Sequence, residues 1–71
     1  MNDFGVIFKI YYAPMRDELC RDLRLRFNCG LFLVEDSNIM GVFDYDKVKP
    51  SMIEEFVKEH QRDMCILEKM I

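Results

Sequence analysis

The chain has 71 residues, of which 51% are hydrophobic and 32% are charged, and this balance predicts one folded domain over residues 1–71 and excludes a disordered chain. A domain of this size buries only about 60% of its unfolded surface, which leaves little volume for an enclosed substrate pocket and disfavours an enzyme. The net charge of −3 disfavours general nucleic-acid binding, because that affinity comes mostly from Lys and Arg side chains that neutralise phosphates.

The first predicted element is a strand over residues 4–12, a segment rich in β-branched and aromatic side chains. Pro14 suits the first turn of a helix, which is predicted to run to about Phe27. Asn28 and Gly30 are the predicted stop signal of this helix. Its apolar stripe repeats every four residues, at Met15, Leu19, Leu23 and Phe27.

A hairpin is predicted over residues 29–46, CGLFLVEDSNIMGVFDYD. Its turn is placed at Ser37-Asn38, because Asn tolerates the positive φ that a two-residue loop needs. This turn sets the register of the two strands, with Leu33 opposite Val42, and side chains then alternate between two faces. The face predicted to be core carries Phe32, Val34, Ile39, Phe43 and Tyr45.

The second face of the predicted hairpin has an apolar centre and an acidic border, which is the composition of an interface with another chain. The centre consists of Leu31, Leu33, Met40 and Val42, and the border of Glu35, Asp44 and Asp46. An alternative is that one helix covers each face, so that this face is a second layer of core. A loop longer by one residue would exchange the two faces.

A second helix is predicted to begin at Ser51, because Ser51 and Glu54 have the spacing of a capping box. Its apolar positions continue at helical spacing to the C-terminus, through Ile53, Val57, His60, Met64, Leu67 and Ile71. The long helix is the preferred prediction. It would leave several apolar side chains without a buried position, namely Leu25, Cys65, Ile66 and Met70. The alternative is a turn at residues 60–63 followed by a strand over residues 64–71.

These elements predict an α+β fold, a small single-layer antiparallel or mixed sheet with two helices in the order β-α-β-β-α. With the fourth strand, the order would be β-α-β-β-α-β and the fold ferredoxin-like.

The cysteines Cys20, Cys29 and Cys65 are odd in number and have no CxxC spacing, which predicts reduced, mostly buried thiols rather than a disulfide framework or a metal site. With no signal peptide or membrane span in the pattern, a cytoplasmic location is expected. His60, the single histidine, is interpreted as a packed residue, since no partner is placed to make it a catalytic base. No catalytic residue and no cofactor are predicted.

Three further patterns are interpreted as structural rather than functional. Four acids could hold a divalent cation, but no calcium-loop spacing exists and a solvated rim is preferred: Glu35, Asp36, Asp44 and Asp46. The strand aromatics could stack nucleic-acid bases but are preferred as core: Phe8, Tyr11, Tyr12, Phe43 and Tyr45. A run of arginines is offset by neighbouring acids and is preferred as a solvated helix face: Arg16, Arg21, Arg24 and Arg26.

Residues 42–57, VFDYDKVKPSMIEEFV, resemble the third strand and second helix of heavy-metal-associated domains. Those domains bind metal through a CxxC motif after the first strand, where this chain has residues 11–15, YYAPM. The resemblance therefore does not imply metal binding, and no family is assigned.

The functional hypothesis is a small non-enzymatic protein that binds another protein or forms a homodimer through the apolar hairpin face, with the C-terminal helix as a further contact. A stoichiometric inhibitor or adaptor would have these properties, by analogy with phage-encoded anti-host proteins. Two alternatives stay open: a dimeric ferredoxin-like ligand-sensing module, and a nucleic-acid binder that uses its strand aromatics.

Overall fold

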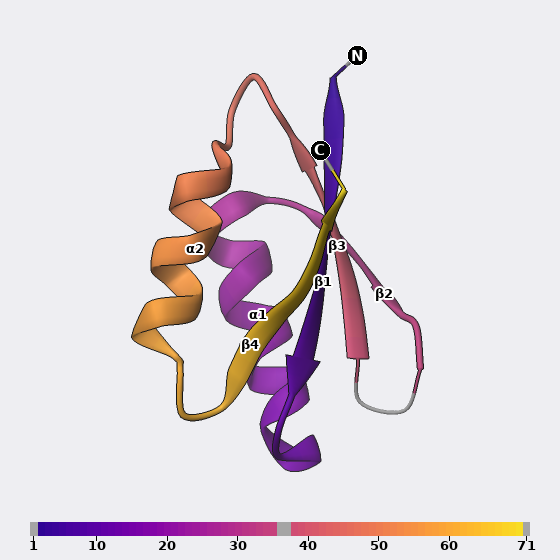
Figure 1. Cartoon of the computed structure of the whole chain (residues 1–71), viewed down its shortest axis with the longest axis vertical. Helices are drawn as coiled ribbons and strands as arrows, with labels where there is room; N and C mark the ends of the chain where they lie inside the picture. The colour runs from indigo at the N-terminus through magenta and orange to yellow at the C-terminus, as the bar shows by residue number, and fades with distance from the viewer. Residues whose placement is uncertain (1, 36–37, 71) are drawn as a thin grey trace.

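The computed structural model describes residues 2–35 and 38–70, which form one sheet and two helices (Figure 1). In chain order the elements are β1 (Asp3–Ile10), a 3-10 turn (Ala13–Met15), α1 (Arg16–Phe27), β2 (Gly30–Leu33), β3 (Asn38–Asp44), α2 (Pro50–Glu59) and β4 (Met64–Met70). The strand order is β2-β3-β1-β4, or β4-β1-β3-β2 from the other edge, and every neighbouring pair is antiparallel. The fold is α+β with the order β-α-β-β-α-β.

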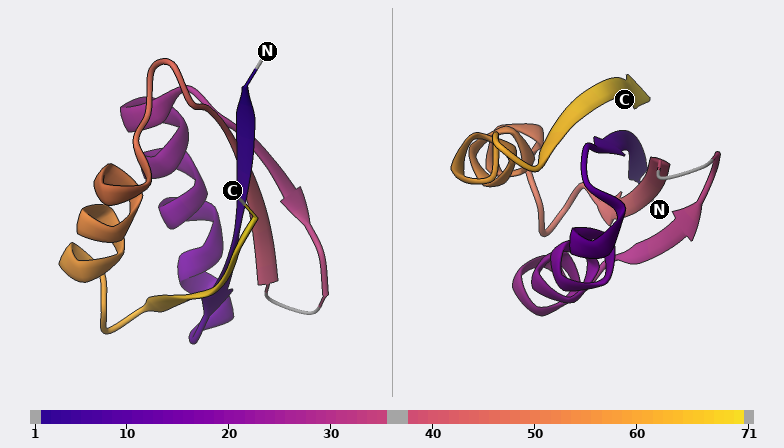
Figure 2. Two further views of the ribbon diagram at one scale, coloured as in Figure 1. Left: turned by 45° about the horizontal axis from the view of Figure 1, so that its top comes forward. Right: turned by 90° about the horizontal axis from the view of Figure 1, so that it is seen from below.

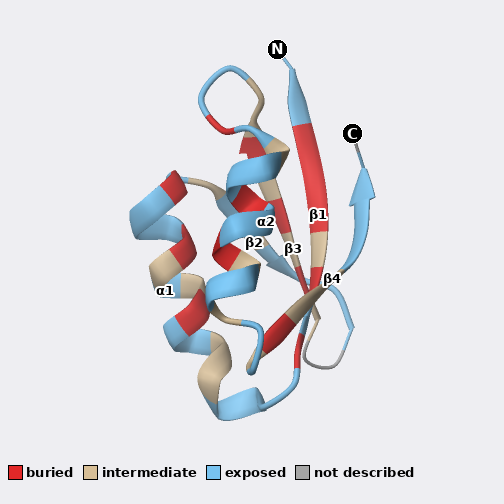
Figure 3. Cartoon of the chain, turned by 60° about the vertical axis from the view of Figure 1, so that its left-hand side comes forward, coloured by how far each residue is buried: buried red, intermediate tan, exposed pale blue. Residues whose placement is uncertain are grey.

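Both helices pack on the same face of the sheet (Figure 2). The hydrophobic core lies between the helices and the sheet, and in Figure 3 the buried positions of the helices face the strands. The core consists of Phe4, Val6, Phe8, Ile10, Leu19, Leu23, Phe27, Ile39, Phe43, Val48, Ile53, Phe56 and Met64. The chain thus buries one face of its sheet with its own helices.

Aromatic rings fill the centre of this core. The Phe43 ring stacks on Phe4 at a centroid distance of 5.4 Å and meets the edges of Phe8 and Phe27 at 6.4 and 6.0 Å. Phe27 in turn contacts Phe56, which joins the two helices to the sheet. Burying each such ring contributes about 1.5–3 kcal/mol, so this cluster is a main source of stability.

The prediction for α1 is confirmed. The helix ends at Phe27, and Asn28 takes the left-handed conformation with φ 49° while its N–H donates to the Arg24 carbonyl at 2.9 Å. The stripe residues Leu19 and Leu23 are buried. Gly30 belongs to β2 rather than to the stop signal of the helix.

The predicted long helix is wrong. The α2 helix begins at Pro50, where the Lys49 N–H donates to Met52 Sδ at 3.3 Å, and it ends at Glu59. A turn closed by the Asp63 N–H on the His60 carbonyl leads into β4, whose Met64 is buried beside Ile10 of β1. Pairing with a central strand outweighs the helical propensity of this segment, because propensity is a weak preference that tertiary contacts override. Ile71 lies outside the described residues.

The predicted register of the hairpin is also wrong. Leu33 pairs with Ile39 instead of Val42, so that β2 ends at Leu33 and β3 begins at Asn38. The shift of three residues is odd, so it exchanges the faces of β2: Leu31 packs against the core, and Phe32 faces away from it. The predicted register would have added Phe32 to a face that the aromatic cluster already fills. Ser37, in the predicted turn, lies outside the described residues.

Gly41 of β3 lies beneath the aromatic cluster, which generates a stability prediction. A Cβ added at Gly41 would meet Phe43 Cε2 at 2.7 Å and Phe8 Cε2 at 3.3 Å. We expect Gly41→Ala to lower the free energy of unfolding by about 1–3 kcal/mol, because the rings must shift. Urea denaturation measures the change.

The matched control for this prediction is Gly30→Ala in β2, where the nearest atom to an added Cβ is Phe32 Cε2 at 3.5 Å and the position is exposed. We expect this variant to be as stable as the wild type or more so, because Ala restricts the unfolded chain. Equal destabilisation by the two substitutions would contradict the packing of Gly41 described above.

Candidate interaction surfaces

The face of the sheet opposite the helices, here called the open face, carries the alternate residues of all four strands. Two rows of directly paired residues cross its centre. One row is Phe32, Met40, Ile7 and Glu68, and the other is Gly30, Val42, Gly5 and Met70. No described element covers this face (Figure 2). Its centre is therefore apolar and accessible.

The exposure of the open face increases toward its edges. Phe32 on β2 is 54% exposed and Met70 on β4 is 41% exposed, whereas Ile7, Met40 and Val42 at the centre are half-buried by their neighbours. Charged and polar residues mark the two ends of the face. Lys9 and Asn38 pair at one end, and Asp3 and Asp44 pair at the other.

The seven residues of the predicted interface do not share one surface. Met40 and Val42 lie on the open face as predicted, but Leu31 and Leu33 turn to the helix side of β2. Asp44 ends β3 and accepts the Asp46 N–H on its Oδ1 at 2.9 Å. Glu35 is exposed in the hairpin connection, where its carbonyl accepts the Asn38 N–H.

Sequence reasoning missed three residues of the open face, Ile7, Phe32 and Met70. The alternation in β1 could have identified Ile7, because Phe4, Val6 and Phe8 are large and apolar while the intervening Gly5 and Lys9 are not core residues. The predicted long helix left three residues of the β4 segment without a buried position, and the strand places them on both faces of the sheet. Ile66 packs against the core, and Cys65 and Met70 pair with open-face positions of β1. Leu25 on α1 is 79% exposed.

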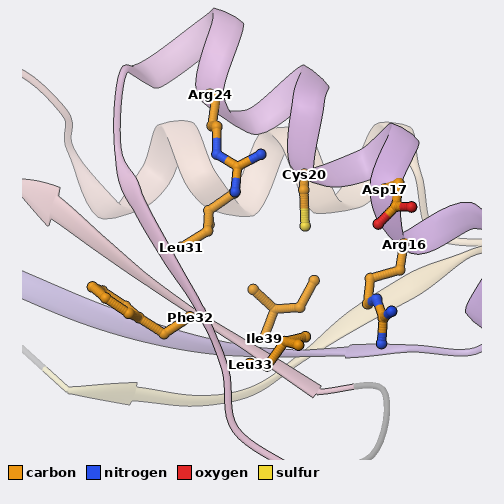
Figure 4. Close-up of a pocket in the computed structure, with 8 residues that line it drawn as sticks. All are labelled: Arg16, Asp17, Cys20, Arg24, Leu31, Phe32, Leu33 and Ile39. Atoms are coloured by element: carbon orange, nitrogen blue, oxygen red, sulfur yellow. The ribbon is translucent and has the colours of Figure 1, made fainter.

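A second surface feature is a groove of about 190 Å³ between α1 and β2 (Figure 4). Its lining consists of Arg16, Asp17, Cys20, Arg24, Leu31, Phe32, Leu33 and Ile39. In Figure 4 the Cys20 side chain points from α1 toward Ile39, and the two arginines lie on either side of it. The groove has an apolar floor on the sheet and charged groups along the helix.

The cysteine side chains are free thiols, each half-buried. Burial raises the pKa of the Cys20 thiol, an effect that the neighbouring Arg24 and Arg16 charges oppose and Asp17 reinforces. Burial also raises the pKa of Cys29, whose Sγ lies 3.8 Å from the Leu23 carbonyl. A hydrogen bond with Cys65 raises the pKa of the Tyr11 phenol.

His60 is packed, as predicted. Its ring stacks on Phe56 at 4.3 Å, and Nδ1 lies 2.9 Å from the Phe56 carbonyl, which can only accept, so Nδ1 carries the proton. Nε2 lies 4.0 Å from Asp22, a neighbour that sequence reasoning did not identify. Cys65 points to the open face, on the other side of the sheet. His60 and Cys65 therefore do not form a nucleophile and base pair.

The aromatic residues that were considered for base stacking, and that the sequence favours as core, differ in burial. Phe8 and Phe43 are buried in the core and present no face to a base, whereas Tyr11 and Tyr12 are exposed after β1. The described ranges 2–35 and 38–70 contain no group of three or more His, Cys, Asp or Glu residues able to hold a metal ion. Asp36, one of the four acids considered, lies outside these ranges.

Comparison of the chain with protein-family models, with curated proteins and with solved structures finds no match. No helix in the described part of the chain is long and apolar enough to cross a membrane.

The raised thiol pKa values generate a prediction for alkylation. A thiolate is the reactive form, so at pH 8 Cys20 and Cys29 should react more slowly with iodoacetamide than a free cysteine peptide. Arg24→Gln removes a charge that lowers the pKa of Cys20 and should slow Cys20 further without changing Cys29 as much. Site-resolved mass spectrometry over pH 7–10 measures both rates. A faster reaction of Cys20 in the Arg24→Gln protein would contradict the placement of Arg24.

Proposed function

We propose that this chain is a non-enzymatic protein-binding module, an inhibitor or adaptor, that uses the open face of a ferredoxin-like sheet to contact its partner. The observation that supports this proposal is the uncovered apolar centre formed by Phe32, Met40, Ile7, Val42 and Met70. Protein interfaces have this anatomy, with aromatic and Met side chains at the centre and charged groups at the border.

The size of the face indicates how much of the surface a partner would use. Strands about 4.8 Å apart and paired from Asp3 to Lys9 give a flat area of roughly 400 Å². Stable interfaces bury about 800 Å² on each partner. A partner would therefore extend beyond the open face onto the exposed edges, where Val34 and Leu67 are 46% and 50% exposed.

A second copy of the chain is a second candidate partner. The open face has Lys9 at one end and the acids Asp3 and Asp44 at the other. Two copies stacked face to face about a two-fold axis, with their strands antiparallel, would bring each Lys9 over the acids of the other copy. This charge arrangement is self-complementary, as an isologous interface requires.

The substitution Met40→Glu tests the proposal at the centre of the open face. We expect the fold to persist, with a loss of about 1 kcal/mol in the free energy of unfolding, because Met40 is half-buried by Ile7 and Phe32. Binding through this face should fall by at least about tenfold, since a buried, unpaired carboxylate is costly at an interface. Affinity capture measures partner binding, and light scattering over a hundredfold concentration range measures self-association.

The matched control is Met52→Glu, the same substitution on α2, on the helix side of the molecule. A Glu at this third helical position can accept the Lys49 N–H that Met52 Sδ accepts in the wild type, so the fold should be unaffected. We expect the wild type and Met52→Glu to bind the partner, or to dimerise, equally well. Met40→Glu should lose this binding. Retention by folded Met40→Glu would show that the contact surface lies elsewhere.

A further inference from the structure

The outer edge of β2 leaves backbone groups available for another strand. β2 is an edge strand, paired only with β3 in the described structure. The Val34 N–H donates to the Asn38 carbonyl at 3.0 Å, and hydrogen-bonded positions recur at every second residue. Gly30 and Phe32 therefore direct their backbone groups to β3, and Leu31 and Leu33 direct theirs outward. An edge of this kind can pair with an extended segment of another chain.

The side chains of the same two residues form the floor of the α1–β2 groove. Leu31 and Leu33 lie on the helix side of the sheet together with Ile39, below Cys20 of α1 (Figure 4). Leu33 is 67% exposed, so the groove opens at its end of β2. A strand added beside β2 would direct alternate side chains to this helix side. One apolar side chain of the added strand would then lie over the groove.

The charges along the groove favour an acidic occupant. Arg24 lies at the Leu31 end and Arg16 at the Leu33 end, with Asp17 as the one acid of the lining (Figure 4). Neither arginine takes part in the ion pairs of the described residues, which join Arg26 to Glu59 and Lys69 to Glu54. The groove is therefore positive on a chain whose net charge is −3.

The spacing of the arginines matches that of a strand. Arg24 follows Arg16 by eight positions in α1, which is about 12 Å along a helix. Residues i and i+4 of a strand are about 13 Å apart and point to the same face. Acidic side chains at these two positions, with an apolar side chain between them at i+2, would meet both guanidinium groups and the groove floor.

We propose that the β2 edge and the α1–β2 groove bind an extended acidic segment of a partner protein, of the pattern acidic-x-apolar-x-acidic, which adds to the sheet as a fifth strand. This site does not depend on the open face, so it goes beyond the function proposed above. A second copy of this chain is a poor occupant, because pairing β2 with β2 would bring Arg16 and Arg24 of both copies to the same side of the sheet.

Titration of the ¹⁵N-labelled chain with the peptide Thr-Glu-Thr-Leu-Thr-Glu-Thr tests this proposal. We expect the largest amide shifts at Leu31 and Leu33, whose N–H groups would become hydrogen-bonded. The charge-reversed peptide Thr-Lys-Thr-Leu-Thr-Lys-Thr should bind at least about tenfold more weakly, because it places like charges at Arg16 and Arg24. Equal affinity for the two peptides, or shifts confined to the open face, would overturn the proposal.

Substitutions in α1 distinguish binding in the groove from general electrostatic attraction to the chain. Arg24→Glu should lower the affinity for the Glu peptide by at least about tenfold, and Arg24→Gln should lower this affinity by less. Arg21→Glu changes the net charge equally at an exposed position outside the groove, so it should change the affinity by less than about twofold. An equal effect of Arg21→Glu and Arg24→Glu would overturn the site. So would a dimer that forms through β2 and excludes the peptide.

The same titration distinguishes this proposal from the open-face function. Met40→Glu alters the open face at a residue that does not line the groove, so it should bind the Glu peptide as the wild type does. Bound peptide should also slow the alkylation of Cys20 in the groove and leave Cys65 on the open face unaffected. The opposite pattern of protection would place the peptide on the open face and overturn the assignment.

Discussion

The pairing of β1 with both β3 and β4 is the constraint on which the rest of the structure depends. It makes β1 a central strand, so its alternate residues must suit two different environments. Phe4, Val6 and Phe8 enter the core beneath the helices, and Ile7 lies on the other face among apolar neighbours. Both helices lie on the same face of the sheet, and none of the described elements covers the opposite face, which leaves an apolar surface there.

The features that could be predicted from the sequence are those that local patterns of residues determine. The four-residue stripe of α1 and the left-handed Asn28 are local features, as is the alternation of β3 that places Ile39 in the core and Met40 outside it. The register of β2 could not be predicted, because it depends on how many rings the core holds around Phe43. The groove beside Leu31 was not predicted for the same reason, because the wrong register placed Leu31 and Leu33 on the other face of the hairpin.

The C-terminal segment shows how a helical period can arise by coincidence. Residues 53 to 67 have apolar side chains at helical spacing, yet Met64 and Ile66 also alternate as a strand requires. No glycine or proline marks the break after His60. Only the availability of the β1 edge, a contact between distant parts of the chain, decides in favour of β4. Tertiary pairing of this kind leaves little trace in local sequence.

The central claim is that the face opposite the helices is uncovered in the isolated chain. Methionine methyl groups measure this directly, because Met40 and Met70 lie on that face while Met64 is 1% exposed in the core. A soluble paramagnetic agent added to dilute protein with ¹³C-labelled Met methyls should strongly broaden the signals of Met70 and Met40 and spare that of Met64. Protection of Met40 and Met70 equal to that of Met64 would contradict the account.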